Sequence, residues 1–400
     1  MNDNSTSATD AKPLPFPVII HVDMNSFYVS VEKRDDINLR DKVVVVGKKK
    51  SPAIVTSCDY AARDKGVMAG MSIYKARQLC PEMVLVEPDM AKYENESKLL
   101  MEILRRVAGP DAVFEKVSVD EAYVDVSAAC QGTDADDSLK KAVPIGWKIK
   151  ELMLTERHLL SSVGIASERF ITKLASDSCK PNSSHPSGLL MVLESEKMDF
   201  LKPFKVEKLY GVGEVTQGKL NAVGIYTVAN LIDYADDLCA VVGKSNGETL
   251  KSYVRGKDKK GITPKGKPKQ YTKQKSWDWE DKPLGDDVFP WLMNLVKKIA
   301  ADLRENKVLA VNVEVSVCYE YREKGNDGHD HANLTVPTDD MGIILATAVT
   351  LLKKNNFLDK PLQKIHVGAT KVVSQGAAAK EVSKPKSKSK KTDGGQIKLF

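Results

Sequence analysis

Two adjacent carboxylates interrupt a strand-like segment, and no other feature constrains the fold so strongly. Residues 117–126 read V-S-V-D-E-A-Y-V-D-V, with Asp120 and Glu121 among the β-branched and aromatic residues that are typical of a strand. Neighbouring like charges in a half-buried sheet repel each other unless a cation neutralises them. Because strand alternation places neighbours on opposite faces, both can reach one ion only at a bend or hairpin tip, which the small Ala122 would not obstruct. A surface turn between two strands would also explain the pattern, so a metal site needs a third carboxylate.

Asp23 is the candidate for this third carboxylate, because it follows a buried-type strand at residues 18–22. Mg²⁺ prefers oxygen ligands, usually carboxylates together with phosphate oxygens and water. Three carboxylates on two neighbouring strands can hold two such ions about 3.5 to 4 Å apart, as in nucleotidyl transfer. We therefore expect Asp23, Asp120 and Glu121 to be the catalytic residues and to bind two Mg²⁺ ions.

The segments that carry these carboxylates resemble the two catalytic motifs of the Y-family translesion DNA polymerases. They read D-M-N-S-F-Y-V-S-V-E at residues 23–32 and S-V-D-E-A-Y-V-D at residues 118–125. The resemblance is strongest to the bacterial polymerase IV branch of the family. Asn25 departs from that branch, which usually has a second Asp there, and is similar to the polymerase V catalytic subunit. The resemblance also implies that the Met24 carbonyl completes one metal shell.

The resemblance implies a set of residues that bind the incoming nucleotide. An aromatic pair after a strand is more often part of a core than of a site. In the family, however, Tyr28 corresponds to the steric gate, an aromatic ring that excludes a 2′-hydroxyl, and the neighbouring Phe27 is assigned to the nucleotide site with it. Arg169 stands where the family usually has Lys. The residues that the resemblance assigns to the triphosphate are Tyr60, Arg63, Arg169 and Lys173.

The resemblance extends over nearly the whole chain and implies an α+β multidomain fold, a right-hand polymerase. It comprises a ferredoxin-like palm, small fingers, a helical thumb with a helix-hairpin-helix, and a βαββαβ little finger. In chain order we expect a disordered leader at 1–16, palm at 17–33 and 87–182, fingers at 34–86, thumb at 183–256, a basic linker at 257–270, little finger at 271–373, a disordered tail at 374–395 and a clamp-binding peptide at 396–400.

Hydrophobic periodicity predicts the main elements of the two sheet domains. In the palm it predicts strands at 18–22 and 162–166, a hairpin at 115–127 and helices at 93–107 and 138–157. The segment G-N-D-G-H-D-H, which contains His329 and His331, is typical of a polar hairpin loop. The little finger is predicted as strand, helix, strand, strand, helix and strand at 276–279, 289–306, 308–321, 332–337, 341–355 and 362–373.

Charge and composition indicate a polyanion as the partner. The formal net charge is +6, but residues 257–275 hold eight Lys against one Asp, and residues 374–400 hold seven Lys against one Glu and one Asp. These blocks suit contacts with DNA phosphates, although such blocks are often only solvated linkers. The sequence contains no apolar run long enough for a membrane span and no signal peptide, so we expect a cytoplasmic protein. The six scattered cysteines are expected to be free thiols.

Two further segments predict contacts with DNA and with a protein partner. Gly211 and Gly213 fit a helix-hairpin-helix, in which exposed backbone amides bind a DNA phosphate, and Lys219 lies in the following helix. The chain ends in Q-I-K-L-F, which is similar to the bacterial sliding-clamp-binding peptide. We expect Gln396, Leu399 and Phe400 to bind the clamp, although a coincidental apolar terminus is the alternative.

Together these features predict a template-directed DNA polymerase of low fidelity that adds deoxynucleotides to primer-template DNA and acts as a monomer in lesion bypass. Two alternatives belong to other classes of protein. A palm-type nucleotidyl cyclase would share the paired carboxylates but would need no DNA. A clamp-associated DNA-binding protein without catalysis would share the thumb, linker and tail.

Overall fold

The computed structural model describes residues 16–49, 53–183, 185–258, 261–264, 266, 268–277, 279–319 and 327–375. The expected leader, apart from residue 16, lies outside the described residues, as does the tail from residue 376 with the candidate clamp peptide. The chain divides into two compact units, Met1–Lys265 and Gly266–Phe400, and each is described by itself. The boundary between the units falls inside the segment predicted as a basic linker.

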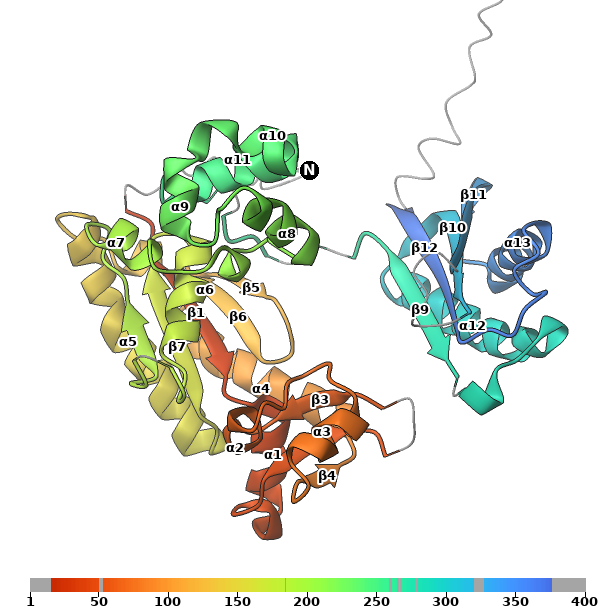
Figure 1. The fold of residues 1–400 in the computed structure, drawn as a ribbon, viewed down its shortest axis with the longest axis horizontal. Helices are drawn as coiled ribbons and strands as arrows, with labels where there is room; N and C mark the ends of the chain where they lie inside the picture. Colours follow the sequence, from red (N-terminus) through yellow and green to blue (C-terminus); the bar gives the residue numbers. More distant parts are fainter. Residues whose placement is uncertain are drawn as a thin grey trace, which may run out of the picture. The chain divides into compact units, whose positions relative to one another are not determined.

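The first unit is built on a five-stranded sheet with the order β5-β6-β1-β7-β8 (Figure 1). The neighbours β5–β6, β6–β1 and β1–β7 are antiparallel, and β8 is parallel to β7. This is the ferredoxin-like arrangement of two strand-helix-strand passages around a hairpin. Its elements are β1 (Ile19–Met24), α4 (Met90–Ala108), β5 (Val113–Lys116), β6 (Glu121–Asp125), α5 (Ala135–Arg157), β7 (Ser161–Ala166), α6 (Arg169–Ser178) and β8 (Leu189–Met191).

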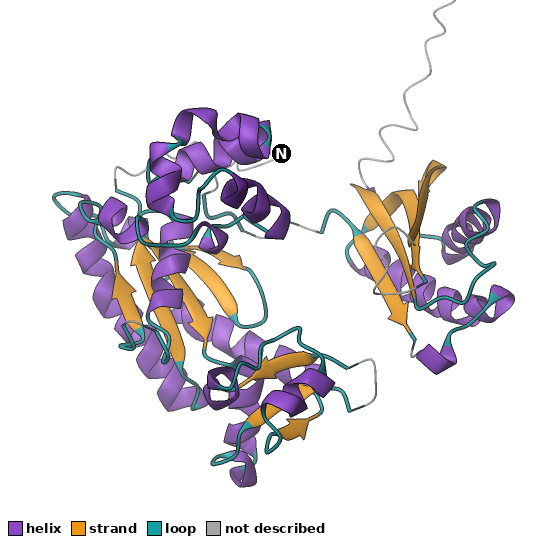
Figure 2. Ribbon diagram, viewed as in Figure 1, coloured by secondary structure: helices purple, strands orange, loops and turns teal. Residues whose placement is uncertain are grey.

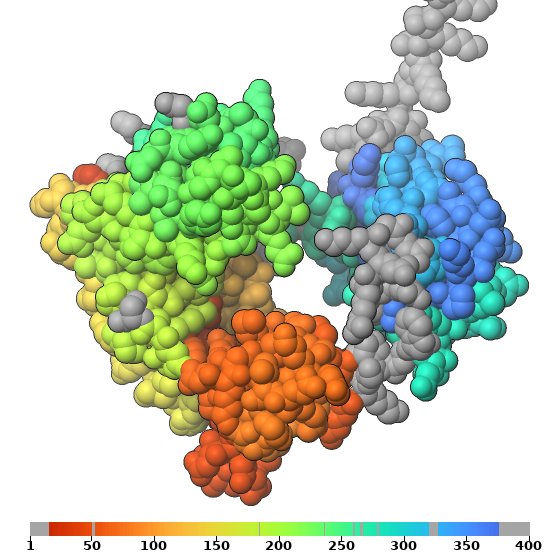
Figure 3. Space-filling model, viewed as in Figure 1, coloured from red at the N-terminus to blue at the C-terminus, as the bar shows by residue number. Residues whose placement is uncertain are grey.

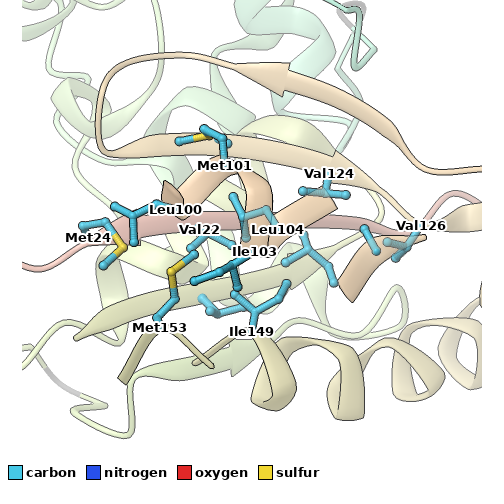
Figure 4. Close-up of a cluster of buried hydrophobic side chains, with 14 of the residues drawn as sticks. Val22, Met24, Leu100, Met101, Ile103, Leu104, Val124, Val126, Ile149 and Met153 are labelled. Carbon is cyan, nitrogen blue, oxygen red and sulfur yellow. The ribbon is translucent and has the colours of Figure 1, made fainter. Parts of the chain in front are cut away.

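Alternation along the central strand separates an apolar face of this sheet from a polar one. Val22 and Met24 point into a core that α4 and α5 complete with Leu104 and Met153, all nearly or fully buried (Figure 4). His21 and Asp23 project from the opposite face, which is partly covered by α6. The polar face is therefore the side of the sheet on which the predicted site lies.

A small three-stranded module is inserted between β1 and α4. Its strands have the order β3-β2-β4, with β2–β3 antiparallel and β2–β4 parallel. Its two shortest helices begin with side-chain caps: Asp59 accepts a hydrogen bond from Ala62 N, and Ser72 accepts one from Lys75 N. The elements are α1 (Phe27–Asp35), β2 (Val44–Gly47), β3 (Val55–Cys58), α2 (Tyr60–Asp64), α3 (Ile73–Leu79) and β4 (Val84–Val86).

The rest of the first unit is a bundle of short helices with its own core. This core also includes Phe170 and Leu174 of α6, so the bundle packs directly on the helix that covers the polar face of the sheet. Figure 2 shows that the bundle contains almost no strand. Its helices are α7 (Lys197–Leu201), α8 (Glu214–Ala222), α9 (Val228–Asp233), α10 (Leu238–Val242) and α11 (Lys244–Tyr253).

The second unit is a four-stranded antiparallel sheet, β11-β10-β12-β9, with two helices on one face. Its elements are β9 (Tyr271–Ser276), α12 (Phe289–Glu305), β10 (Val308–Cys318), β11 (Asp327–Thr338), α13 (Met341–Lys354) and β12 (Lys364–Ser374). The predicted strand at 276–279 is wrong, because pairing with β12 selects the polar Tyr271–Ser276 instead. His329 and His331, predicted in a loop, lie in β11, where they pair with Ser316 and Glu314 on the open face of the sheet. Polar residues can form a strand there because that face needs no burial.

Candidate active site

Asp23 and Glu121 face each other directly across the antiparallel pair β1–β6. Side chains that are paired in this way lie on the same face of a sheet, about 5 Å apart at Cβ. Asp120 occupies the bend at residues 118–120, just before β6, and its carbonyl accepts a hydrogen bond of 3.0 Å from Met24 N. The bend that Asp120 and Glu121 need in order to act together is therefore present.

Two lysines lie against Asp23, and one of them also lies against Glu121. Lys173 of α6 places its Nζ 2.9 Å from Asp23 Oδ2 and 3.4 Å from Glu121 Oε1. Lys180, just beyond the end of α6, places its Nζ 3.1 Å from the same Asp23 oxygen. Both ammonium groups also contact Asp177, at 3.3 and 2.9 Å. Positive charge is thus concentrated at Asp23 and Glu121.

The pKa values of the three carboxyl groups diverge. Burial alone would raise the pKa of Asp23, but the charges of Lys173 and Lys180 outweigh burial and hold the pKa below its ordinary value. The pKa of Asp120 is raised by burial and by the negative charges of Asp23 and Glu121, against a hydrogen bond from Ser118. Asp120 therefore lacks the cation that the other two carboxylates have.

The chemistry of these residues fits Mg²⁺. Within the described ranges, no three His, Cys, Asp or Glu side chains are already gathered as they would be around a metal ion. The donors are nevertheless the hard oxygens that Mg²⁺ takes, on two paired strands and the bend that adjoins one of them. A cation would also relieve the repulsion that raises the pKa of Asp120. The residues present therefore suit a magnesium site without change of strand pairing.

The predicted triphosphate contacts Tyr60 and Arg63 lie together on α2. The Arg63 guanidinium lies 5.0 Å from the centre of the Tyr60 ring, and its Nε donates to Cys58 O at 3.3 Å. The Tyr60 hydroxyl is buried and makes no hydrogen bond to the described residues. Lys180 and Asp23 both influence its pKa, which burial raises. The phenol is thus a donor without a partner among the described residues, and it lies near Lys180.

Tyr28 and Phe27 occupy the first turn of α1. The Tyr28 ring is half-buried and stacks on Tyr93 of α4, with ring centres 4.1 Å apart. Tyr93 is fully buried, and its hydroxyl donates to Glu32 Oε1 at 2.7 Å. Phe27, only 3% exposed, belongs to the palm core. The structure thus presents Tyr28 on a rigid support, whereas Phe27 packs in the interior as the general preference of aromatic residues suggests.

Arg169 does not reach the carboxylates. Its Nη2 binds Glu115 Oε1 at 2.9 Å, and its guanidinium lies over the Tyr123 ring, 4.2 Å from the ring centre. Lys180, which the sequence interpretation did not select, lies on Asp23 instead. Its position in the same basic segment, seven residues after Lys173, was the available signal, but Lys180 lies past the end of α6, where helical spacing no longer applies.

Asn25, the departure in the first motif, is integrated into the palm. Its Oδ1 accepts a hydrogen bond of 2.8 Å from Ser162 Oγ of β7, and its carbonyl accepts one of 2.6 Å from Ser30 Oγ. The side chain is only 6% exposed. The side chain of Asn25 therefore binds β7, and its backbone carbonyl binds the first turn of α1.

The predicted phosphate-binding hairpin precedes α8. Gly211 has a φ of 89°, which favours glycine, and Gly213 is the N-cap with a φ of −86°. A Cβ atom at either position would meet nothing within 4 Å. Lys219 lies in the last turn of α8.

The space-filling view shows the first unit hollowed between the green helical bundle and the orange three-stranded module (Figure 3).

Comparisons with known proteins agree with this architecture. Residues 22–177 match the impB/mucB/samB family, residues 268–382 match its C-terminal domain, and residues 194–225 match the helix-hairpin-helix motif of the IMS family. The chain therefore belongs to the impB/mucB/samB family, the Y-family translesion DNA polymerases.

Within that family, the chain is similar to proteins named DNA polymerase IV. It is 30% identical over 362 residues to the one from Desulfatibacillum aliphaticivorans, covering 90% of this chain and 87% of that one. It is 36% identical over 281 residues to the one from Xanthomonas euvesicatoria pv. vesicatoria, covering 70% and 74%.

A solved structure shows the same fold. A Y-family DNA polymerase chimera, Dbh-Dpo4(243-245)-Dbh, superposes with a TM-score of 0.74 at 22% identity, covering 88% of this chain and 98% of that one. The α+β fold is that of a right-hand polymerase, with the five-stranded sheet as palm, the three-stranded module as fingers, the helical bundle as thumb and the second unit as little finger. None of the described helices is both long and apolar enough to cross a bilayer.

Proposed function

We propose that this chain is a template-directed DNA polymerase that adds deoxynucleotides to a primer 3′-hydroxyl, with the low fidelity and lesion bypass of its family. The cross-strand pair of Asp23 and Glu121, with Asp120 at the adjoining bend, is the observation that carries the proposal. The helix-hairpin-helix of the thumb, together with the palm, favours a reaction on DNA over the reaction of a nucleotidyl cyclase, which acts on a free nucleotide.

The three carboxylates are the proposed catalytic residues. Asp23, Asp120 and Glu121, with the Met24 carbonyl, would hold two Mg²⁺ ions. Bound there, the ions would supply charge stabilisation for the primer oxygen and the α-phosphate. The protein itself holds Asp23 and Glu121 on two paired strands and Asp120 at the adjoining bend, and α6 covers part of that face.

The nucleotide triphosphate is proposed to bind beside the carboxylates. Tyr60, Arg63 and the two lysines provide a hydroxyl, a guanidinium fork and two ammonium groups, all suited to phosphate oxygens. Lys173 and Lys180 would exchange their contacts with Asp23 for the triphosphate. Arg169 would contribute only if its ion pair with Glu115 opened, so it is the weakest member of the expected set.

The remaining partners follow from segments outside this site. Gly211, Gly213 and Lys219 of the thumb would contact DNA phosphates without reading sequence. The peptide with Gln396, Leu399 and Phe400, which lies outside the described residues, would bind a sliding clamp. We further propose the domain boundaries given above, a monomer, and a cytoplasmic location.

Primer extension tests the reaction. Wild-type protein and Asp120→Asn/Glu121→Gln are supplied with primer-template, Mg²⁺ and four deoxynucleotides, with Glu151→Gln on the exposed side of α5 as control. Extension by the wild type and the control alone supports the proposal. Tight DNA binding without extension by any of them, even with a clamp, would indicate a DNA-binding protein, and template-independent conversion of a nucleotide would indicate a cyclase.

A further inference from the structure

A buried histidine connects the catalytic face of the sheet to helix α6. His21 is fully buried, and its Nε2 lies 2.8 Å from Glu121 Oε1. Its Nδ1 lies 2.7 Å from Ser176 Oγ. The Tyr123 ring, its cross-strand partner, packs against the imidazole with ring centres 4.4 Å apart. The ring is thus held between two polar contacts and one aromatic contact.

The available donors and acceptors determine which atom donates in the contact between His21 and Glu121. The carboxylate can only accept, so Nε2 must carry a hydrogen and donate it. Ser176 Oγ has one hydrogen, which it can donate either to Nδ1 or to Lys173 O, 2.8 Å away. In the first case His21 is neutral, and in the second Nδ1–H donates to Ser176. Nε2 donates to Glu121 in both cases, so the conclusion is independent of the protonation state.

This donation selects one oxygen of the carboxylate. Both His21 and Lys173 contact Glu121 Oε1, and no residue of the described segments donates a hydrogen bond to Oε2. The side chain is 20% exposed, and its Oε2 has no hydrogen-bond donor among the described residues. His21 and Lys173 thus hold the same oxygen and leave Oε2 available to another ligand.

We propose that His21 is a positioning residue that orients Glu121 so that one oxygen faces the reaction site, and that Ser176 sets the orientation of the imidazole. The inference rests on the proposed function, in which Glu121 is a metal ligand. Hydrogen-bond partners behind metal ligands typically change metal affinity or activity about ten- to hundredfold when they are removed.

The test compares His21→Phe, which keeps a ring but loses the donor, with His21→Gln, which keeps a donor. Mn²⁺ binding is measured by electron paramagnetic resonance on the full chain with a dideoxy-terminated primer-template and a deoxynucleotide. We expect His21→Phe to weaken Mn²⁺ binding about ten- to hundredfold and His21→Gln to restore most of it. In extension assays the maximal rate should fall and the Mg²⁺ requirement rise, with DNA affinity unchanged.

Ser176→Ala provides a second variant that leaves the core intact, with Ser178→Ala as its matched control. Ser178 also donates to a backbone carbonyl of α6, Leu174 O at 2.7 Å, but does not touch His21. We expect a smaller shift of Mn²⁺ affinity for Ser176→Ala and none for Ser178→Ala.

Three results would overturn the inference. They are unchanged Mn²⁺ affinity in a primer-extending His21→Phe, equal effects of the two serine variants, and a failure of His21→Gln to restore binding in a folded protein. A wild type that never extends a primer would instead count against the proposed function itself.

Discussion

Gly164 of β7 lies directly opposite His21 of β1 in the palm sheet. A Cβ atom at Gly164 would lie 2.6 Å from Ser176 N and still closer to Thr172 O, both backbone atoms of α6. The missing side chain therefore lets α6 approach the sheet. That approach brings Lys173 to the carboxylates and Ser176 to His21.

Gly164→Ala is expected to displace α6 and to lower both stability and primer extension. The new methyl group would clash with backbone atoms, which cannot rotate away as a side chain can. We therefore expect the free energy of unfolding to fall by about 3 kcal/mol, the upper end of the usual range for overpacked substitutions. Thermal unfolding and extension rates measure the two effects. Gly218→Ala in α8, where a Cβ would meet nothing within 4 Å, is the control and should not destabilise. A fully active, stable Gly164→Ala would contradict the tight packing.

Tyr60→Phe is expected to weaken deoxynucleotide binding without lowering stability. The buried hydroxyl has no partner among the described residues, so its loss breaks no hydrogen bond in the free protein. A lost hydrogen bond to a phosphate would raise the nucleotide dissociation constant about tenfold or more. Single-nucleotide incorporation measures this constant. Tyr74→Phe on α3, which is 75% exposed, is the control, and an equal effect there would refute the role of Tyr60.

Tyr28→Ala is expected to increase ribonucleotide incorporation. The ring stacks on the buried Tyr93 and cannot retreat easily, so truncation should remove the collision with a 2′-hydroxyl. We expect the preference for deoxynucleotides to fall about tenfold or more. The ratio of the two incorporation efficiencies tests this. Tyr28→Phe keeps the ring and should keep the preference, and a preference that survives truncation would place the gate elsewhere.

Gly213→Ala is expected to weaken DNA binding while leaving the free protein intact. The φ of −86° suits alanine, and a Cβ would meet no protein atom within 4 Å. Only a phosphate close to the backbone would be obstructed. Fluorescence anisotropy with a labelled duplex measures the affinity, at two salt concentrations. Unchanged affinity at both would show that no phosphate approaches this turn.

Glu96→Gln is expected to destabilise the palm near neutral pH but less in acid. Glu96 is 4% exposed and receives two 2.7 Å hydrogen bonds from Arg157. Burial would raise its pKa, but hydrogen bonds from Arg157 and Arg34 outweigh burial and lower the pKa below the ordinary 4.5. A lowered pKa stabilises the fold above pH 4.5, and this contribution is lost as pH falls through the folded-state pKa.

The expected loss at neutral pH is about 2 kcal/mol, because the two arginines keep partial access to water. Hydrogen exchange in α4 and α5, measured near pH 7 and below pH 4, should show the difference between variant and wild type shrinking in acid. Glu156→Gln is the control, since its ion pair with Arg106 is exposed on both sides. A constant difference at both pH values would show that the effect is packing alone.

Local sequence determined the faces of the elements and the chemistry of the site. Alternation in β1 puts Val22 in the core and Asp23 on the polar face, and the D-E pair required the bend that precedes β6. Such patterns are readable because side-chain direction repeats every two residues in a strand and every 3.6 in a helix. The family motifs extended this to the palm, fingers, thumb and little finger.

Tertiary structure alone decided which of these faces meet. Palm and little finger share a strand-helix-strand-strand-helix-strand order, yet the third strand is interior in the palm, as β6, and at the edge in the little finger, as β11. Lys180 contacts Asp23 across 157 residues of sequence, whereas Arg169 is held by Glu115. Local periodicity could not predict these differences. It specifies which face of a helix or strand is buried, but not which element packs against that face. The partner depends on packing and charge pairing summed over the whole fold.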